Sequence, residues 1–359
     1  MSKKSMLLNS PIEPFLVEPN LNANEILQRM EKISFQGRNL AIARKVWNSM
    51  LEDNVLIFLG IAGALSAGGL RLLIAYLIQH RYIDCLVSTG ANLYHDLHET
   101  RGRSHFIGSP NTDDQLLQTE HIDRVYDTFV DENEFIDNDI WISNFATTLE
   151  PRNYTTREFL YLLGKKLWQE TSRDGILTAA FRANVPIFCP AISDSSIGMG
   201  LSQARHKDPQ KGQIDVIGDI AESANLVIRR RPTASIVFGG GTPKNFINQA
   251  AVQAEFYKPG GEGHRYALQI ITDPPHFGGA SGSTLDEAKS WGKVSGNAER
   301  VTVHADVTLA LPLLASALAS TAQERLKKRR AAKFLLEGPI ISVDGIPFPE
   351  NDYETFKND

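Results

Sequence analysis

Short runs of apolar and β-branched residues recur along this chain, and stretches with helical periodicity lie between several of them. Because such runs are typical of buried strands, we predict six strands, at 55–60, 83–89, 185–192, 234–240, 267–273 and 301–306. Apolar positions with helical spacing predict helices over 70–80, 156–171, 243–257 and 307–326. The alternation of strands and helices predicts an α/β fold with a doubly wound, mostly parallel sheet.

Both ends of the chain and one internal stretch differ in composition from this alternating part. We expect residues 1–40, which are rich in Asn, Pro and Glu, to form an N-terminal extension. Residues 41–330 then form the functional domain, and residues 331–359 form a C-terminal tail. Residues 102–139 are polar with few periodic apolar positions, so we expect an excursion over the sheet.

Composition and charge narrow the class of protein. With 359 residues, 42% hydrophobic content and a net charge of −5, the chain suits a globular protein with no electrostatic reason to bind nucleic acid or an anionic membrane. Residues 55–70 are uncharged but contain four glycines, which favours a buried strand, turn and helix over a membrane span. The basic run 325–330 predicts a solvated helix end. Cys85 and Cys189 lie in apolar runs, and no secretory signal is expected, so we expect a reducing, cytoplasmic setting.

Glycine and small polar residues follow several of the predicted strands. In a parallel sheet the carboxyl ends of the strands form the ligand-binding edge, where glycine allows a pyrophosphate to approach the backbone. Each loop alone could be a plain strand-to-helix turn, and the usual GxGxxG spacing is not matched. Together they predict one dinucleotide crevice, formed by residues 60–69, 88–92, 193–200 and 239–241.

Lys293 is a candidate covalent catalyst. It ends the segment 286–293, in which Trp291 and a glycine precede it. A lysine amine is nucleophilic only when it is neutral, and an aromatic neighbour with glycine beside it allows a dry, close approach. Taken alone, however, these residues favour an ordinary surface lysine on a short helix over Schiff-base chemistry.

The order and spacing of these segments resemble the deoxyhypusine synthase family over roughly residues 40 to 325. Eight segments carry the resemblance: Phe-Leu-Gly (58–60), Tyr-Leu-Ile-Gln-His (76–80), Asp-Cys-Leu-Val-Ser-Thr (84–89), Pro-Ile-Phe-Cys-Pro-Ala-Ile-Ser-Asp (186–194), the triple glycine (239–241), Glu-Ala-Lys-Ser-Trp-Gly-Lys (287–293), His-Ala-Asp (304–306) and Pro-Leu-Leu (312–314). It implies a homotetramer of Rossmann-like subunits that use NAD to move an aminobutyl group from a polyamine such as spermidine to an acceptor amine through a lysine imine.

The resemblance also implies roles for individual residues. Lys293 matches the family's catalytic lysine, and Trp291 and Glu287 match positions that contact the amine substrate. The matched NAD-contacting positions are Thr89, Gly90, Ala91, Asp194, Gly240, Gly241, Thr272, Asp306 and Val307.

Several of the family's charged substrate groups are replaced. Asn245 stands where the family has a histidine, and the family's acids are replaced by Met199, Phe277, Ala280 and the pair Tyr94 and His95. Because carboxylates hold a polycation in a partly dry site, their loss should cost at least roughly a few kcal/mol of spermidine binding. The remaining acids and aromatic groups predict a shorter or less charged donor, held by Asp96, Asp273, Glu287, Tyr94, Phe277 and Trp291.

Two questions stay open in the sequence. The acceptor is either a lysine of the hypusine-containing translation factor or a free diamine, as in homospermidine synthesis. The alternatives to transfer are a catalytically silent NAD-binding oligomer and a simple NAD-dependent amine dehydrogenase. No metal site is expected: His95 and His98 could share a helix face, but there is no HExxH motif, and a histidine beside the 88–92 loop suits a ribose or substrate contact.

Overall fold

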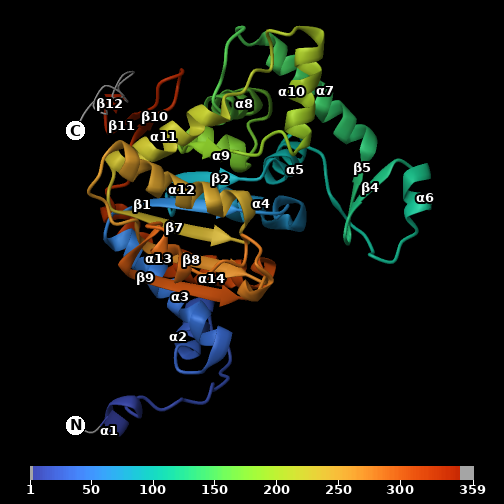
Figure 1. Ribbon diagram of the computed structural model, residues 1–359. Coiled ribbons are helices and arrows are strands. Elements are labelled where there is room, and N and C mark those ends of the chain that lie inside the picture. Colours follow the sequence, from blue (N-terminus) through green and yellow to red (C-terminus); the bar gives the residue numbers. More distant parts are fainter. Residues whose placement is uncertain (1–2, 348–359) are drawn as a thin grey trace.

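The core of the protein is a six-stranded sheet, and the computed structural model describes residues 3–347 around it (Figure 1). Every neighbouring pair of its strands runs parallel. Across the sheet the order is β6 (Ile187–Phe188), β2 (Cys85–Ser88), β1 (Leu56–Ile61), β7 (Thr233–Phe238), β8 (His264–Ile271) and β9 (Val294–His304). Counted along the chain this is the order 3-2-1-4-5-6 of a Rossmann-like sheet, so the predicted fold class is confirmed.

Helices connect these strands and cover both faces of the sheet (Figure 1). The helical segments are α1 (Lys3–Leu7), α2 (Ala23–Met30), α3 (Phe35–Glu52), the π-helical η1 (Ser66–Leu70), α4 (Arg71–Gln79), α5 (Gly90–Thr100), α6 (Asp114–Thr119), α7 (Glu132–Thr148), α8 (Thr156–Thr171), α9 (Ile176–Ala183), α10 (Ser196–Lys207), α11 (Val216–Arg229), α12 (Gly241–Tyr257), the 3-10 turn η2 (Pro275–Phe277), α13 (Glu287–Ser290), α14 (Val307–Thr321) and α15 (Gln323–Lys328).

Alternate side chains of the strands enter two separate apolar layers. On β1, Ile57 and Leu59 pack in the layer that contains α3, α4 and α14, whereas Leu56 and Phe58 pack in the layer that contains α11 and α12. All six residues of β1 are buried, because both faces of a parallel sheet are covered. This double burial is why the strands appear in the sequence as continuous apolar runs.

Two strands and one helix differ from their predicted extents. β6 ends after two residues because the Cys189 N–H donates to Thr156 Oγ1 at 2.9 Å and Pro190 has no N–H to continue the ladder. β9 begins seven residues earlier than expected, at Val294, with a register irregularity opposite the start of β8. The helix predicted over 307–326 is divided at Ala322 into α14 and α15.

The N-terminal segment is joined to the main body. Leu27 of α2 is fully buried in the main apolar core, and α2 packs against α14. The domain boundary expected at residue 40 falls inside α3, which also packs against β9. The part of the chain before α2 extends away from the sheet, with α1 at its end (Figure 1).

The C-terminal segment folds back onto the layer that contains α11. It forms a small antiparallel sheet of β10 (Phe334–Leu335), β11 (Ser342–Val343) and β12 (Ile346–Pro347). The buried Arg157 holds it by donating to the Leu336 carbonyl at 2.8 Å, while its other nitrogens bind Glu222. Residues 348–359 of the expected tail lie outside the described residues.

The polar stretch after α5 forms a separate projection, and we call residues 102–131 the arm. It contains α6 and an antiparallel sheet in the order β3, β5, β4, formed by Phe106–Ile107, Thr128–Asp131 and Ile122–Val125. Figure 1 shows the arm extending beyond the edge of the main sheet, so the expected excursion over the sheet is wrong.

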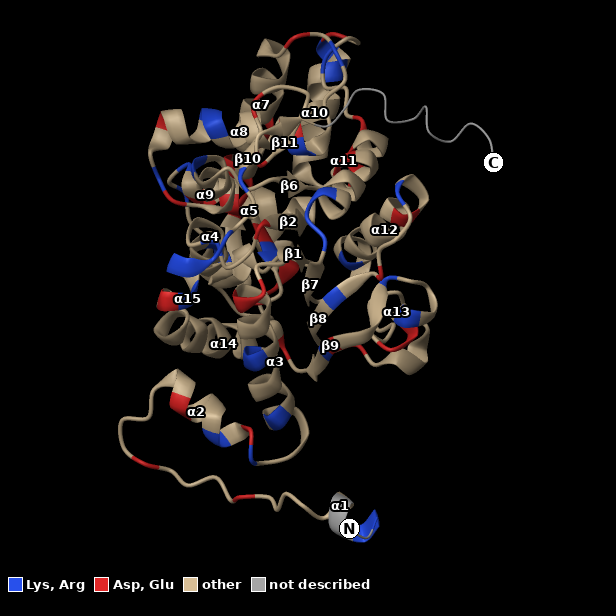
Figure 2. Ribbon diagram, turned by 90° about the vertical axis from the view of Figure 1, so that its left-hand side faces the viewer, with Lys and Arg blue, Asp and Glu red and all other residues tan. Residues whose placement is uncertain are grey.

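Charged residues of both signs are interspersed along the helices and loops (Figure 2). The basic run near α15 is only partly solvated, because the Arg329 guanidinium is buried and ion-paired with the buried Asp84. Residues 55–70 contain β1 and η1, as predicted. Within residues 3–347, no helix has the length and apolar character needed to cross a bilayer.

Candidate active site

The sheet reverses its winding between β1 and β7, and the turns after these two strands touch. Gly239 has a φ of 79°, and a Cβ at this position would lie 3.0 Å from the Ala62 Cβ. The Ala62 N–H donates to the Phe238 carbonyl at 3.0 Å. Ligands of Rossmann-like sheets bind outside the carboxyl ends of the strands at this reversal. The glycine loops predicted to form a crevice therefore have the expected place in the fold.

Polar contacts fix the turn after β2 against the turn after β1. The Thr89 hydroxyl donates to the Gly63 carbonyl at 2.7 Å and accepts from Asn92 Nδ2 at 3.0 Å. Asn92, which is fully buried, also accepts from the Ser66 N–H at 3.1 Å. Thr89 is the N-cap of α5, so the next N–H groups, of Gly90 and Ala91, have no acceptor within the helix. These donors at a helix N-terminus suit the phosphate of a dinucleotide.

A close approach brings the start of α5 to the start of α10. A Cβ on Gly90 would lie 2.2 Å from Ser195 Oγ and 2.4 Å from Ser195 Cβ, so no larger residue fits without movement. Asp194 precedes this serine and is exposed on the turn between β6 and α10. The two helix starts therefore lie side by side at the carboxyl edge.

The triple glycine lies beneath a loop of the same chain. The Gly241 N–H donates to Ser281 Oγ at 2.9 Å, and a Cβ on Gly240 would lie 2.5 Å from Ser281 Cα. Pro243, in the same first turn of α12, has no N–H. The start of α12 thus offers an anion fewer free donors than the start of α5. The close approach of this loop explains why residue 240 is a glycine.

The remaining predicted cofactor positions follow β8 and β9. Thr272 is exposed after β8, and Asp306 is the N-cap of α14, where its carboxylate accepts from the Thr308 N–H at 2.7 Å. Hydrogen bonding from Thr308 lowers the pKa of Asp306. Val307 is buried. All the predicted cofactor positions therefore lie at the same, carboxyl edge of the sheet.

Lys293 lies at the opposite end of β9. Its carbonyl accepts from the His264 N–H at 3.0 Å, at the amino ends of β8 and β9, whereas Asp306 follows the carboxyl end of β9. The paired part of β8 spans seven residue steps from His264 to Ile271. At about 3.3 Å per step this separates the two ends by about 23 Å. Within one chain, the structure does not bring the Lys293 backbone to the predicted cofactor crevice.

Two of the other predicted substrate residues, Trp291 and Glu287, lie on the same loop as Lys293, and the third, Asn245, lies on α12. Trp291 is 66% exposed, and the Lys293 ammonium lies 5.1 Å from the centroid of its ring. Glu287 is exposed and accepts from the Thr284 N–H at 3.1 Å. Asn245 is half-buried in the first turns of α12. We call residues 272–293 the lysine loop.

Tyr94 is held by α7, and His95 is held by the arm. Tyr94 is buried and donates to the Phe135 carbonyl at 2.8 Å, and His95 Nδ1 is 2.8 Å from His105 Nε2. Burial lowers the pKa of His95 to about 4, and the neighbouring His105 acts in the same direction. Neither side chain is free to contact a substrate in the crevice, so the expected histidine contact is wrong for His95.

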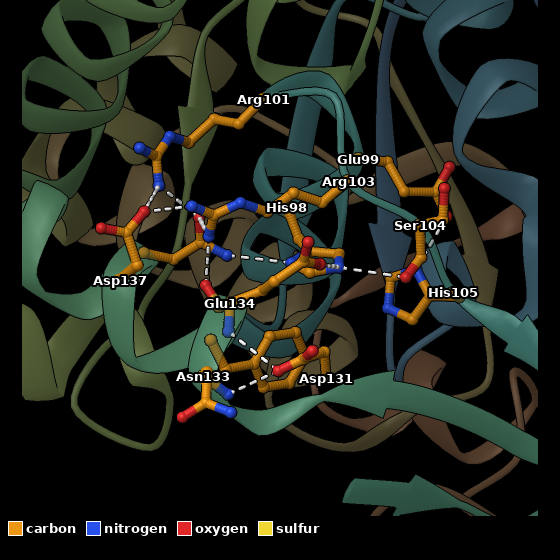
Figure 3. Close-up of polar contacts among 12 residues, drawn as sticks. His98, Glu99, Arg101, Arg103, Ser104, His105, Asp131, Asn133, Glu134 and Asp137 are labelled. Carbon is orange, nitrogen blue, oxygen red and sulfur yellow. Dashed lines mark hydrogen bonds and ion pairs between the residues drawn. The ribbon is translucent and has the colours of Figure 1, made fainter. Parts of the chain in front are cut away.

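His98 is likewise held by the arm and by α7 (Figure 3). Its Nδ1 is 3.0 Å from Asn138 Nδ2 and its Nε2 is 3.2 Å from the Ser104 carbonyl. Burial lowers the pKa of His98 to about 4. Figure 3 shows Arg101 and Arg103 converging on Asp137 of α7 beside this histidine. Within residues 3–347, no group of three or more His, Cys, Asp or Glu side chains is arranged to hold a metal ion.

The acids expected to compensate for the replaced groups are not all available. Asp96 is fully buried, accepting from Arg71 Nε at 3.1 Å and from the Leu177 N–H at 3.1 Å, so it cannot face a substrate. Asp273 is exposed beside Thr272. Asp273 and Glu287 therefore remain as accessible carboxylates.

A cavity of about 290 Å³ lies at the amino ends of β7 and β8, next to the Lys293 backbone: its lining includes Gly263, where a Cβ would lie 2.9 Å from the Lys293 carbonyl oxygen. Its lining includes Arg231 and Arg265 together with Glu255, and Arg231 is ion-paired with Glu255. Because its charges are mutually compensated and its lining includes none of the predicted site residues, we assign it no role in the chemistry.

Sequence reasoning missed one residue of this region. Lys244, between Pro243 and Asn245, is 1% exposed and contacts the lysine loop. The signal that could have identified it is a lysine in the first turn of a helix, three residues after the triple glycine. Asn92 was included in a predicted loop, but its buried bonding role was not foreseen.

Comparisons with known proteins agree with these features. The family model for deoxyhypusine synthase matches residues 25–318. The chain is 44% identical to "Probable deoxyhypusine synthase 2" of Methanosarcina acetivorans, over 93% of this chain and 96% of the relative. It is 39% identical to "Deoxyhypusine synthase-like protein" of Coxiella burnetii, over 88% of this chain and 90% of the relative.

A solved structure supports the same fold. The crystal structure from Entamoeba histolytica that is assigned to deoxyhypusine synthase superposes with a TM-score of 0.59 at 17% identity, covering 86% of this chain and 97% of that one. Since the family model spans most of the chain and the two relatives are similar along nearly their whole length, this protein belongs to the deoxyhypusine synthase family.

Proposed function

We propose that this protein transfers an aminoalkyl group from a polyamine to an acceptor amine, with NAD as redox cofactor and Lys293 as covalent carrier. The observation that carries the proposal is the pairing of Lys293 with the exposed Trp291 in a chain of this family. An indole face 5.1 Å from an ammonium can bind an alkylammonium in the same way.

The residues at the carboxyl edge fit NAD in one specific respect. The N–H groups that open α5 are free of intrahelical acceptors, and the turns after β1 and β2 are fixed by Thr89 and Asn92. Gly90 and Ala91 would hold the phosphates, and Asp306 would accept from a ribose hydroxyl. Bound there, NAD would supply the hydride acceptor and donor that the oxidation of the donor amine and the reduction of the product imine require.

Lys293 would carry the group between donor and acceptor. Oxidation of the carbon beside a secondary amine leaves an imine, and the neutral Lys293 amine attacks this carbon and expels the remaining amine of the donor. The acceptor amine then attacks the lysine imine, releases Lys293 and forms a new imine that is reduced to the product. One hydride leaves and one returns, so the cycle has no net oxidation.

The donor would be shorter or less charged than spermidine. Asn245, Met199 and Phe277 are neutral, and two of these side chains, Met199 and Phe277, are exposed. Of the acids expected to hold the donor, Asp273 and Glu287 are accessible. Fewer carboxylates favour a ligand with fewer ammonium groups, because each buried ammonium requires a partner.

The separation of Lys293 from the crevice supports assembly, and we propose a homotetramer in which the lysine of one chain serves the cofactor of another. A test is to mix Lys293→Arg with Gly90→Val, whose side chain would collide with Ser195. Each variant is expected to be inactive alone. Random pairing would restore about a quarter of the sites, since half of the pairs are mixed and each has one intact site. No recovery would contradict a shared site.

The transfer itself is tested with isotopically labelled amines and NAD. Label in a small product when a diamine is added identifies a free-diamine acceptor, and label on the hypusine-containing translation factor identifies a protein acceptor. NADH that accumulates without transfer would support the amine dehydrogenase instead. NAD binding without any reaction of putrescine, spermidine, agmatine or homospermidine would support the silent oligomer.

A further inference from the structure

Lys244 is a buried lysine whose contacts all lie on the lysine loop. Its side chain leaves the first turn of α12 and is 1% exposed. The Nζ donates to the Ser281 carbonyl at 3.2 Å, to Ser283 Oγ at 3.0 Å and to the Ser283 carbonyl. Three oxygen acceptors are the full complement for an ammonium group. Lys244 therefore clamps residues 281–283 through hydrogen bonds, and its ammonium group is not solvated.

Neighbouring groups hold the same stretch of loop. Gln269 of β8 donates to the Ser281 carbonyl at 3.0 Å and to the Gly239 carbonyl at 2.9 Å. The Gly241 N–H donates to Ser281 Oγ at 2.9 Å. Residues 281–283 are therefore fixed to both β8 and the turn after β7. The loop continues from there to the Lys293 region without another regular element except α13.

The second half of the loop packs on the sheet through a small apolar cluster. Leu285 and Ala288 are buried against Ala267 of β8 and Val294 of β9. The buried Ala288 lies only five positions after Ser283, where Lys244 makes its contacts. A displacement at 281–283 would therefore be transmitted to the segment that ends at Lys293.

The charges around Lys244 link it to the same region. Burial lowers the pKa of Lys244 to about 8, Glu287 opposes this effect, and the positive charge of Lys293 adds to it. A buried ammonium is retained only when its hydrogen bonds compensate for lost solvation. Burying the Lys244 ammonium costs folding free energy that a hydrophobic residue at this position would not cost. Such a cost is expected where the residue serves to position the loop more than to stabilise the fold.

We infer that Lys244 is a positioning residue, which clamps residues 281–283 and thereby sets where the lysine loop presents Lys293. This inference rests on the proposed function, because the position of Lys293 matters only if Lys293 reacts. Lys244 itself does not touch the reacting atoms in this account.

The test compares Lys244→Met with Lys289→Met in the full-length protein. Methionine keeps the apolar length of the side chain and removes the ammonium. Lys289 is a half-buried lysine of α13 that pairs with Asp286 at 3.5 Å. Two quantities are measured: amide hydrogen exchange across the chain, and the rate at which borohydride traps an adduct on Lys293 at saturating amine and NAD.

For Lys244→Met we expect exchange in the lysine loop to rise by at least about 10-fold, from the loss of charge-assisted hydrogen bonds, with exchange in α14 unchanged. Trapping should slow by at least about 10-fold, because a shift near 1 Å of a reacting group has such effects. Lys289→Met should match the wild type in both. Ser283→Ala, which removes one of the three acceptors, should give a smaller change of the same kind and serves if Lys244→Met does not fold.

Loop exchange and trapping within two-fold of the wild type would overturn the inference. A uniform rise in exchange across the chain would also overturn it, because that result marks a general stability role. If the wild-type protein forms no adduct with any amine, the proposed function fails, and loop-specific exchange alone then decides whether Lys244 is a clamp.

Discussion

Gly90 provides a quantitative test of the crevice geometry. In Gly90→Ala the new Cβ would lie 2.4 Å from the Ser195 Cβ, and ordinary contact begins at about 3.4 Å, so the starts of α5 and α10 must separate by about 1 Å. Overpacking of this kind costs about 1–3 kcal/mol, and the better helix propensity of alanine offsets up to about 1 kcal/mol of it. We expect a net loss of about 1–2 kcal/mol in the free energy of unfolding.

The assay combines urea unfolding with titration of NAD by calorimetry. Displacing the first turn of α5 should weaken NAD binding by about 10-fold or more, beyond any loss of folded protein. Gly296→Ala is the matched control, since a Cβ there meets nothing within 4 Å, and it should leave both quantities unchanged.

A second substitution isolates the contact. Ser195→Gly removes the side chain that Gly90→Ala strikes, so the double variant should recover most of the stability that Gly90→Ala loses. Gly90→Ala with wild-type stability and NAD affinity, or a double variant that behaves additively, would refute the reasoning.

Three further expectations follow from buried or exposed groups. The pKa values of His95 and His98 are lowered to about 4 in the folded protein. Their contribution to the stability of the fold is therefore complete above the ordinary histidine pKa of about 6.5 and is lost as the pH falls toward 4. Hydrogen exchange in the arm should rise over that pH interval before the sheet unfolds. Arg157→Met should lower the free energy of unfolding by about 3–5 kcal/mol in urea titration, because Glu222 stays buried without its partner, and Glu222→Gln should cost less. Trp291→Ala should change stability by less than about 0.5 kcal/mol, since the ring is mostly exposed, while steady-state kinetics should show an amine KM raised about two- to five-fold.

Much of the main sheet could be predicted from the sequence because its strands are buried on both faces. Continuous apolar runs identified β1, β7 and β8 to within a few residues. The short β6 could not be foreseen, since the hydroxyl of Thr156 that takes the Cys189 N–H is 33 residues away in the chain. Local patterns do not encode such a competition.

The candidate site was predictable in part for a similar reason. Residues after parallel strands meet at one edge, so the positions of Thr89, Gly240 and Asp306 followed once the strands were identified. The place of Lys293 did not follow, because it depends on a loop that recrosses the sheet before β9 begins. The packing of Tyr94 against α7 likewise required a contact with Phe135, 41 residues later.

The most direct test of covalent transfer is intact-mass spectrometry after incubation with NAD, an amine and borohydride, which reduces any imine on the enzyme to a stable adduct. The account predicts a mass increase that requires both NAD and a particular amine, that maps to Lys293, that is absent in Lys293→Arg and that is retained in Lys289→Arg. An adduct that survives in Lys293→Arg, or no adduct with any amine despite measurable NAD binding, would contradict it.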